Sequence, residues 1–231
     1  MKNIFLFMIC CVVPCMHKLR AQFISLDTGK LEAVHVYIQA AKTAGKKAIR
    51  VIKDSTIKAV DEPTFVKIKG VDLKDGVIEV KVLSRLLKNA PALARGFIGL
   101  AFRINDDNTK YESIYIRPVN ARVDDQVRRN HAIQYYAYPD HKFDRLRKES
   151  PEKYESYADM EMNKWIRMRI EVKGEQAKLF LNSNKQPALI VNDLKHGAGL
   201  SGAVALWVEV GTEGYFKDLK ILTLPPELNT N

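Results

Sequence analysis

Short runs in which apolar and polar residues alternate recur along most of the chain, and they restrict the fold more than any other feature. In residues 96–104, Leu100 and Phe102 alternate with Gly99 and Ala101. Successive side chains of a strand point to opposite faces of a sheet, so a period of two is typical of strands. Similar runs occupy residues 31–40, 47–53, 65–68, 77–83, 112–117, 131–138, 165–172, 177–181, 189–191, 204–210 and 215–222.

About a dozen short strands, separated by turn residues, predict an all-β protein, and specifically a two-sheet antiparallel jelly-roll β-sandwich. A helical alternative for residues 31–44 is disfavoured by their β-branched content. One short helix is expected at Phe143–Glu149, inside the long polar excursion 140–157. Neither an internal repeat nor a Pro/Ser-rich linker divides the chain, so residues 22–231 are predicted to form one domain.

The N-terminus predicts export. A basic start, the apolar run 4–13 and the small residue Ala21 are typical of a secretory signal peptide over residues 1–21. The apolar run is short for a transmembrane helix, which needs ~20 residues, so we expect no stable membrane insertion after processing. A buried helix or a membrane anchor is the alternative; Cys15 would suit a lipoprotein, but Pro14 precedes it. The expected location is periplasmic or extracellular.

Cysteine usage and charge limit the remaining classes of function. The cysteines of the chain are Cys10, Cys11 and Cys15. All lie in the predicted signal peptide, so the mature chain would carry neither a thiol nor a disulfide. The formal charge of +10 falls to +7 without Lys2, Lys18 and Arg20, and the remaining basic residues are dispersed. A nucleic-acid partner is therefore not predicted.

The stretch 111–139 is unusually dense in aromatic, guanidinium and carboxamide groups. Its two strand patterns flank a loop. A period of two places Tyr115 and Arg117 on one face of the first strand, and Gln134 and Tyr136 on the matching face of the second. This pattern predicts a polar binding face on a sheet.

The predicted ligand contacts are Tyr115, Arg117, Asn120, Arg128, Arg129, Asn130, His131, Gln134, Tyr136 and Trp207. Guanidinium groups could hold sugar hydroxyls or a sugar carboxylate through paired hydrogen bonds. In the alternative interpretation, Arg128 and Arg129 pair with Asp124 and Asp125 and only brace the loop. His131 could act as a general base, but its alternation with core residues favours a structural role.

A glycosidase needs two carboxyl groups, ~5–5.5 Å apart for retention of configuration or ~6.5–9.5 Å apart for inversion. The predicted catalytic carboxylates are Glu209, Asp124 and Asp125. Glu209 follows Trp207 by two residues, so an indole for stacking and a carboxylate would share one face. The alternative is a structural glutamate beside a packed tryptophan.

Metal and cofactor sites are not predicted. The mature chain would lack cysteine, and its histidines are scattered, so zinc spacing is absent. The aspartate pairs 106–107 and 124–125 lack the full calcium-loop signature. The sequence also contains no phosphate-binding glycine loop, nucleophile elbow or nucleotide fingerprint.

Five segments resemble secreted bacterial proteins of the concanavalin A-like lectin/glucanase superfamily, and within it the 3-keto-disaccharide hydrolase domain. These segments are 96–103, 111–118, 128–135, 206–207 and 215–219. The resemblance implies a jelly roll whose concave surface faces carbohydrate. The Glu-x-Asp-x-x-Glu motif of the superfamily's retaining glucanases is absent, so their mechanism does not transfer.

These observations predict an exported carbohydrate-active protein, with a glycoside hydrolase-like site on the concave face. A non-catalytic, lectin-like glycan-binding module is the alternative. A sandwich that binds nucleic acid or protein ranks last, because it would need a continuous basic or apolar patch.

Overall fold

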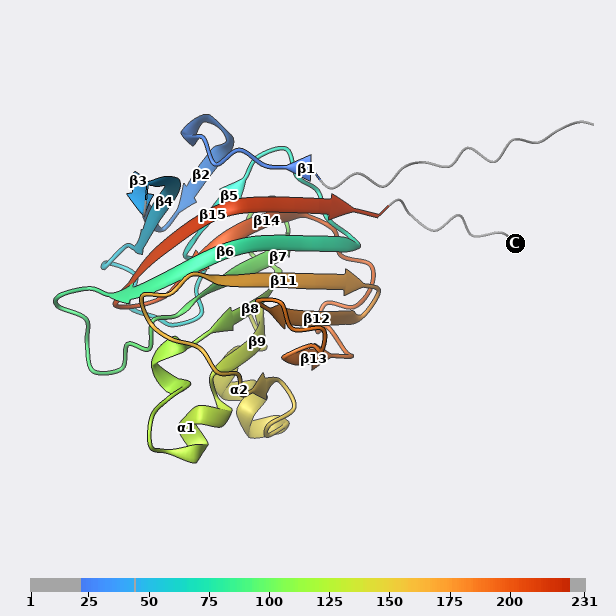
Figure 1. Ribbon diagram of the computed structural model, residues 1–231. Coiled ribbons are helices and arrows are strands. Elements are labelled where there is room, and N and C mark those ends of the chain that lie inside the picture. The colour runs from blue at the N-terminus through green and yellow to red at the C-terminus, as the bar shows by residue number, and fades with distance from the viewer. Residues whose placement is uncertain (1–21, 44, 225–231) are drawn as a thin grey trace, which may run out of the picture.

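The computed structural model describes residues 22–43 and 45–224. The predicted signal peptide with its cysteines lies outside the described residues, as does Ala44 in the turn expected after the first strands. The described chain forms two antiparallel sheets packed face to face (Figure 1), which confirms the predicted jelly-roll β-sandwich.

The first sheet, sheet A, has the strand order β13-β12-β11-β6-β15-β4-β3, and β1 also pairs with β15. Its strands are β1 (Gln22–Phe23), β3 (Val36–Thr43), β4 (Lys46–Lys53), β6 (Gly76–Leu86), β11 (Ile166–Lys173), β12 (Gln176–Leu181), β13 (Leu189–Val191) and β15 (Thr212–Thr223). The long strands β6 and β15 lie at its centre.

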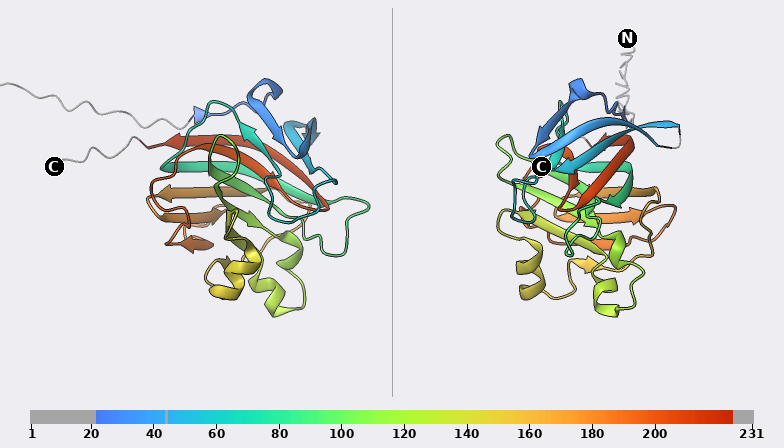
Figure 2. Two further views of the ribbon diagram at one scale, coloured as in Figure 1. Left: turned by 180° about the vertical axis from the view of Figure 1, so that it is seen from behind. Right: turned by 90° about the vertical axis from the view of Figure 1, so that its left-hand side faces the viewer.

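The second sheet, sheet B, has the order β10-β9-β8-β7-β14-β5-β2. Its strands are β2 (Leu31–Val34), β5 (Phe65–Ile68), β7 (Ile98–Ile104), β8 (Tyr111–Ile116), β9 (Ile133–Tyr138), β10 (Glu155–Ser156) and β14 (Ala203–Val208). The helical elements are η1 (Thr28–Lys30), η2 (Pro118–Asn120), α1 (Gln126–Asn130) and α2 (Phe143–Glu149). Helices α1 and α2 both lie at the end of the sandwich nearest β9 (Figures 1 and 2).

Three local expectations were wrong. The single strand expected at 31–40 is two strands, β2 in sheet B and β3 in sheet A, because the chain passes between the sheets at His35, whose φ is 50°. The expected loop 120–130 contains α1. His131, expected at the start of a strand, instead caps the C-terminus of α1.

In each strand, every second side chain points into the space between the sheets. Ile78 and Val80 of β6 pack in one buried cluster with Leu100 of β7 and Ile114 of β8. Burying such aliphatic side chains stabilises a fold by about 1.5–3 kcal/mol each. The outer face of sheet A is partly exposed, as the residues of β11 that point away from the core show. In sheet B, by contrast, all six residues of β8 are buried.

The face of sheet B that points away from sheet A carries a layer of rings. This aromatic layer consists of Phe65, Tyr111, Tyr115, Tyr136 and Trp207. Its closest ring centroids, those of Tyr115 and Trp207, lie 4.6 Å apart. Tyr115 and Trp207 are both paired in register with Gly99, and a Cβ at Gly99 would lie 2.5 Å from that of Tyr115. The small residue therefore makes room for the protein's own rings.

Candidate functional site

A pocket of about 300 Å³ opens beside the aromatic layer. Loops before β5 and β7, the end of β8, η2, both α-helices and the end of β14 all contribute to its wall. The lining residues are Val60, Asp61, Leu93, Arg95, Phe97, Tyr115, Arg117, Asn120, Arg128, His131, Phe143, Arg147 and Glu209. Six predicted site residues are thus brought together: Tyr115, Arg117, Asn120, Arg128, His131 and Glu209.

A larger groove of about 780 Å³ lies elsewhere, between residues 23–27, β3, β4 and residues 217–219. None of the predicted site residues lines it. Its wall is mainly apolar, and two of its polar side chains, Ser25 and Asp27, bond to each other, while Asp218 pairs with Lys81. The remaining polar lining is three lysines, Lys42, Lys47 and Lys217, without an aromatic or carboxamide cluster. The smaller pocket is the better candidate site for that reason.

Arg117 is the structural centre of the pocket wall and is 4% exposed. Its guanidinium donates to the Tyr115 hydroxyl at 2.8 Å, to the Gln134 side-chain oxygen at 3.1 Å and to the His131 carbonyl at 2.9 Å. It also pairs with Glu155 at 3.3 Å. All of these partners are protein groups, so Arg117 holds the wall together and has little capacity left for a ligand.

Glu155 was not predicted from the sequence, yet it organises three basic side chains. It accepts hydrogen bonds from Arg117 and from Arg147, whose Nε lies 2.9 Å away, and His131 Nε2 lies 3.5 Å from it. Burial lowers the pKa of His131, and the nearby Glu155 only partly opposes this effect. His131 is therefore mainly neutral near pH 7 and is hydrogen-bonded into the wall through its carbonyl.

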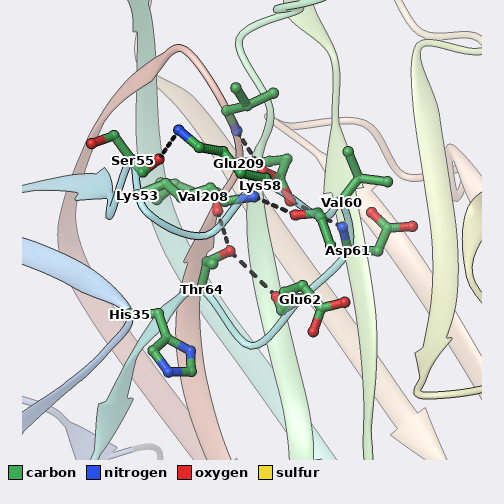
Figure 3. Close-up of polar contacts among 12 residues, drawn as sticks. His35, Lys53, Ser55, Lys58, Val60, Asp61, Glu62, Thr64, Val208 and Glu209 are labelled. Atoms are coloured by element: carbon green, nitrogen blue, oxygen red, sulfur yellow. Dashed lines mark hydrogen bonds and ion pairs between the residues drawn. The ribbon is translucent and has the colours of Figure 1, made fainter.

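Glu209 lies just beyond the end of β14 and is 2% exposed. Its Oε1 accepts hydrogen bonds from the Lys53 ammonium and from the Val210 N–H, and its Oε2 accepts from the Asp61 N–H at 3.0 Å. Figure 3 shows Lys53 and Asp61 converging on Glu209 from different segments of the chain. Burial nevertheless raises the pKa of Glu209 above its ordinary value, with Lys53 opposing this shift. Through the hydrogen bond from the Asp61 N–H, the Glu209 carboxylate connects the end of β14 to the loop 54–64.

Asp61 is the second carboxyl group of the pocket, and it was missed in the sequence. It is 2% exposed, and its backbone has a φ of 51°, in the left-handed region that aspartate tolerates better than most residues. Its Oδ2 accepts a hydrogen bond from the Phe143 N–H at 3.0 Å. Burial raises the pKa of Asp61 to about 7, and the neighbouring Glu209 adds to the shift while Arg117 opposes it. Asp61 therefore exchanges a proton near neutral pH.

Two further arginines line the pocket without a carboxylate partner among the described residues. Arg95 donates to the carbonyls of Ala92 at 2.6 Å and Ala94 at 2.8 Å. Arg128 lies 3.5 Å from the Asn120 side-chain oxygen, and its buried Nε has no hydrogen-bond partner. Burial lowers the pKa of Arg95, and the positive charges of Arg128 and Arg117 lower it further. Arg128 and Arg117 are therefore both close enough to Arg95 to repel its charge.

The other loop residues of the prediction do not line the pocket. Asp125 caps α1, because its side chain accepts the Arg128 N–H at 3.1 Å. Arg129 donates to the Tyr157 hydroxyl at 3.0 Å, and Asn130 accepts from Gln126 at 2.7 Å. Asp124 is exposed outside the pocket wall. Ion pairs between the two aspartates and Arg128 or Arg129 are not formed within the described residues, so that bracing interpretation was also wrong.

Three residues predicted to contact a ligand are buried in the structure, which contradicts that role. Gln134, Tyr136 and Trp207 are each 0% exposed. Gln134 binds Arg117 and the Tyr135 carbonyl, Tyr136 shares a 3.0 Å hydrogen bond with Tyr111, and the Trp207 N–H lies 3.3 Å from the Glu62 carbonyl. The loop 54–64 contacts Trp207 through the Glu62 carbonyl, and none of the three side chains is exposed, so a ligand cannot reach them directly.

The structure adds Asp61, Arg95, Phe97, Phe143 and Arg147 to the pocket. All of them come from loops or α2, where no period of two exists to assign them to a face; Phe97 directly precedes β7. The position of α2 in a long excursion between strands was the one available signal. Within residues 22–43 and 45–224, no three His, Cys, Asp or Glu side chains gather as a metal site would require, and none of the helices is long and apolar enough to cross a bilayer.

No family model matches the chain, and no curated protein matches it in sequence. Similar solved structures include the carbohydrate-binding module CBM66 from Bacillus subtilis, with a TM-score of 0.51, 13% identity, and coverage of 81% of this chain and 94% of that one. A candidate glycosyl hydrolase from Parabacteroides distasonis has a TM-score of 0.52, 11% identity and coverage of 86% and 90%.

A Bacillus subtilis protein with a galectin-like fold has a TM-score of 0.50, 9% identity and coverage of 84% and 90%. At these identities the likeness establishes the fold alone. The chain is a jelly-roll sandwich of the galectin-like and concanavalin A-like class.

Proposed function

We propose that this protein binds a saccharide in the pocket between the loop 54–64, the end of β8 and helices α1 and α2. The observation that carries the proposal is the composition of the pocket wall: guanidinium, carboxamide and carboxyl groups stand beside the rings of Phe97 and Phe143. Sugars combine apolar ring faces with hydroxyl groups that need such partners. A volume of about 300 Å³ is at the small end of ligand sites and suits one or two sugar rings.

The fold supports the same proposal as an analogy. CBM66, which shares the sandwich, is by name a carbohydrate-binding module. Folds host many functions, so this likeness only adds to what the pocket itself offers. Export after removal of residues 1–21, and a single domain over residues 22–231, are part of the proposal and fit a protein that meets glycans outside the cell.

Blocking the pocket mouth tests the proposal. Val60 lines the pocket and is 37% exposed, so Val60→Trp would fill the mouth with little effect on the core. We expect an array of neutral and acidic glycans to give binding for wild type that falls about tenfold or more in Val60→Trp. Ile190→Trp is the matched control, because Ile190 is 46% exposed on sheet A, outside the pocket. Binding that survives Val60→Trp unchanged would exclude this pocket.

Hydrolysis is a second candidate function, favoured by one observation. The pKa of Asp61, raised to about 7, lets this carboxyl group hold a proton near neutral pH, as a general acid requires. Glu209 is the neighbouring carboxylate, although its three donors leave it less free to act as a base or nucleophile. The resemblance to 3-keto-disaccharide hydrolases would make an oxidised disaccharide the substrate.

Turnover and binding can be separated with one substitution. If the protein is a hydrolase, Asp61→Asn should abolish release of reducing sugar from a bound disaccharide while binding persists, because the amide cannot donate the proton in the same way. If wild type binds saccharides but releases no product, hydrolysis is excluded and saccharide binding remains as the proposed function.

A further inference from the structure

The charged groups that line the pocket do not balance one another. Arg117 and Arg147 share Glu155, which lies behind the wall, and Glu209 is neutralised by Lys53. Once these pairs are set aside, the basic side chains of the lining that remain are Arg95 and Arg128. The described part of the chain supplies no carboxylate within ion-pair distance of either guanidinium.

Arg95 and Arg128 also keep hydrogen-bonding capacity. Arg95 spends one terminal nitrogen on the carbonyls of Ala92 and Ala94. Arg128 has only the long 3.5 Å contact to Asn120 and a buried Nε without a partner. An unsatisfied buried donor of a charged group is costly, and each guanidinium has five donors in a planar fork that matches a carboxylate or a sulfate.

We infer that the pocket selects a saccharide carrying an anionic group, a carboxylate or a sulfate ester, and binds that group between Arg95 and Arg128. The inference rests on the proposed function and adds the class of sugar. An anion there would accept hydrogen bonds from terminal guanidinium N–H groups that have no protein partner, and would offset the repulsion that Arg128 and Arg117 exert on Arg95. Asp61 is the remaining carboxyl group of the lining, and below about pH 7 it is protonated and does not cancel this positive charge.

The size of the pocket argues for a single sugar acid over a polyanionic chain lying on the surface. About 300 Å³ encloses one or two rings, and the positive charges are concentrated inside it. A nucleic acid or other long polyanion would need a stripe of basic residues, because its affinity comes from many phosphate contacts.

Matched ligands test the inference. The full-length protein, or its exported form, would be titrated calorimetrically at pH 6 with a neutral galactose disaccharide, with digalacturonate, and with a galactose disaccharide that carries a single sulfate ester. We expect the acidic sugars to bind at least about tenfold more tightly than the neutral one, and this preference to shrink as salt is added. The carboxylated and sulfated arms identify which anion fits better.

Arg95→Gln and Arg128→Gln should each weaken binding of the preferred acidic sugar about tenfold, and should weaken binding of the neutral sugar by a much smaller factor. Arg145→Gln is the matched control, because Arg145 is exposed on α2 and pairs with Glu149 away from the lining. Thermal unfolding and circular dichroism of all three variants would show that the fold is kept.

The failures are distinguishable. Equal binding of neutral and acidic sugars, or equal losses for both sugars in the two arginine variants, would overturn the anionic preference and leave saccharide binding intact. Absence of binding to every sugar in the series and on the glycan array would overturn both proposals. An equal loss in Arg145→Gln would show that net charge, and not the pocket, governs affinity.

Discussion

The two sheets of this sandwich obey the same period of two in sequence but differ in what covers their outer faces. In β11 of sheet A, Ile166, Met168 and Ile170 are buried while the residues between them remain half-exposed. In β7 and β8 of sheet B, every residue is buried. Alternation therefore reports solvent exposure correctly for β11 and fails to do so for β7 and β8.

The difference arises from segments that carry no strand pattern. The loop 54–64 and the start of α2 lie over the aromatic layer and are joined to each other, because the Phe143 N–H binds Asp61 and the Lys142 ammonium pairs with Glu62. Tyr138 at the margin also donates to Glu62 at 3.1 Å. This cover converts a face that resembles a binding platform into a second core, and leaves the pocket at its edge.

The largest expected effect comes from the buried face of sheet B. Trp207→Ala should lower the free energy of unfolding by about 3–5 kcal/mol, as is typical for truncating a fully buried tryptophan. Ile190→Ala, on the exposed face of sheet A, should cost far less, because this side chain is 46% exposed. Urea unfolding followed by circular dichroism measures both. Similar small losses would mean that the aromatic layer is not a core.

A second, smaller effect is expected for Arg117. Arg117→Met would leave Glu155 buried with only Arg147 and His131, and should cost about 2–4 kcal/mol of unfolding free energy. Arg122→Met is the contrast, because this exposed arginine pairs with Asp159 and Glu161 in water. We expect its urea midpoint to stay close to that of wild type. If Arg117→Met were equally harmless, Arg117 would be free to serve a ligand.

The fold was predictable because its information is local. Strand parity, turn residues and spacing identified most of the strands, and errors occurred where one residue redirects the chain, as His35 does between β2 and β3. Convergence of Tyr115, Arg117 and Glu209 on one region also followed from parity.

The rest of the site depended on contacts between distant segments, which a single sequence does not encode in a periodic pattern. The burial of Trp207 requires the loop 54–64, and the role of Arg117 requires Glu155, 38 residues away. Asp61 resembled a turn residue in the sequence. Burial in the folded protein raises its pKa, with a smaller contribution from Glu209, and the Phe143 N–H only partly opposes this shift.

The pH dependence of stability provides the smallest and most specific test of the cover over sheet B. The pKa of Asp61 is about 7 in the folded protein and near the ordinary 3.8 in the unfolded chain, so the folded state holds a proton that the unfolded state releases. Its contribution to stability is present at low pH and is lost as pH rises through 7. Between pH 5 and pH 8, wild type should lose about 2–3 kcal/mol of unfolding free energy through this group.

Asp61→Asn removes the titration and keeps an oxygen that can accept the Phe143 N–H. The variant should therefore match wild type near pH 5 and exceed its unfolding free energy at pH 8, as measured by urea unfolding at both pH values. Asp72→Asn, which removes a charge from an exposed residue, should show no such divergence. Parallel pH profiles for wild type and Asp61→Asn would mean that folding does not raise the pKa of Asp61, and hence that Asp61 is not packed against Phe143 and Glu209 as the structure shows.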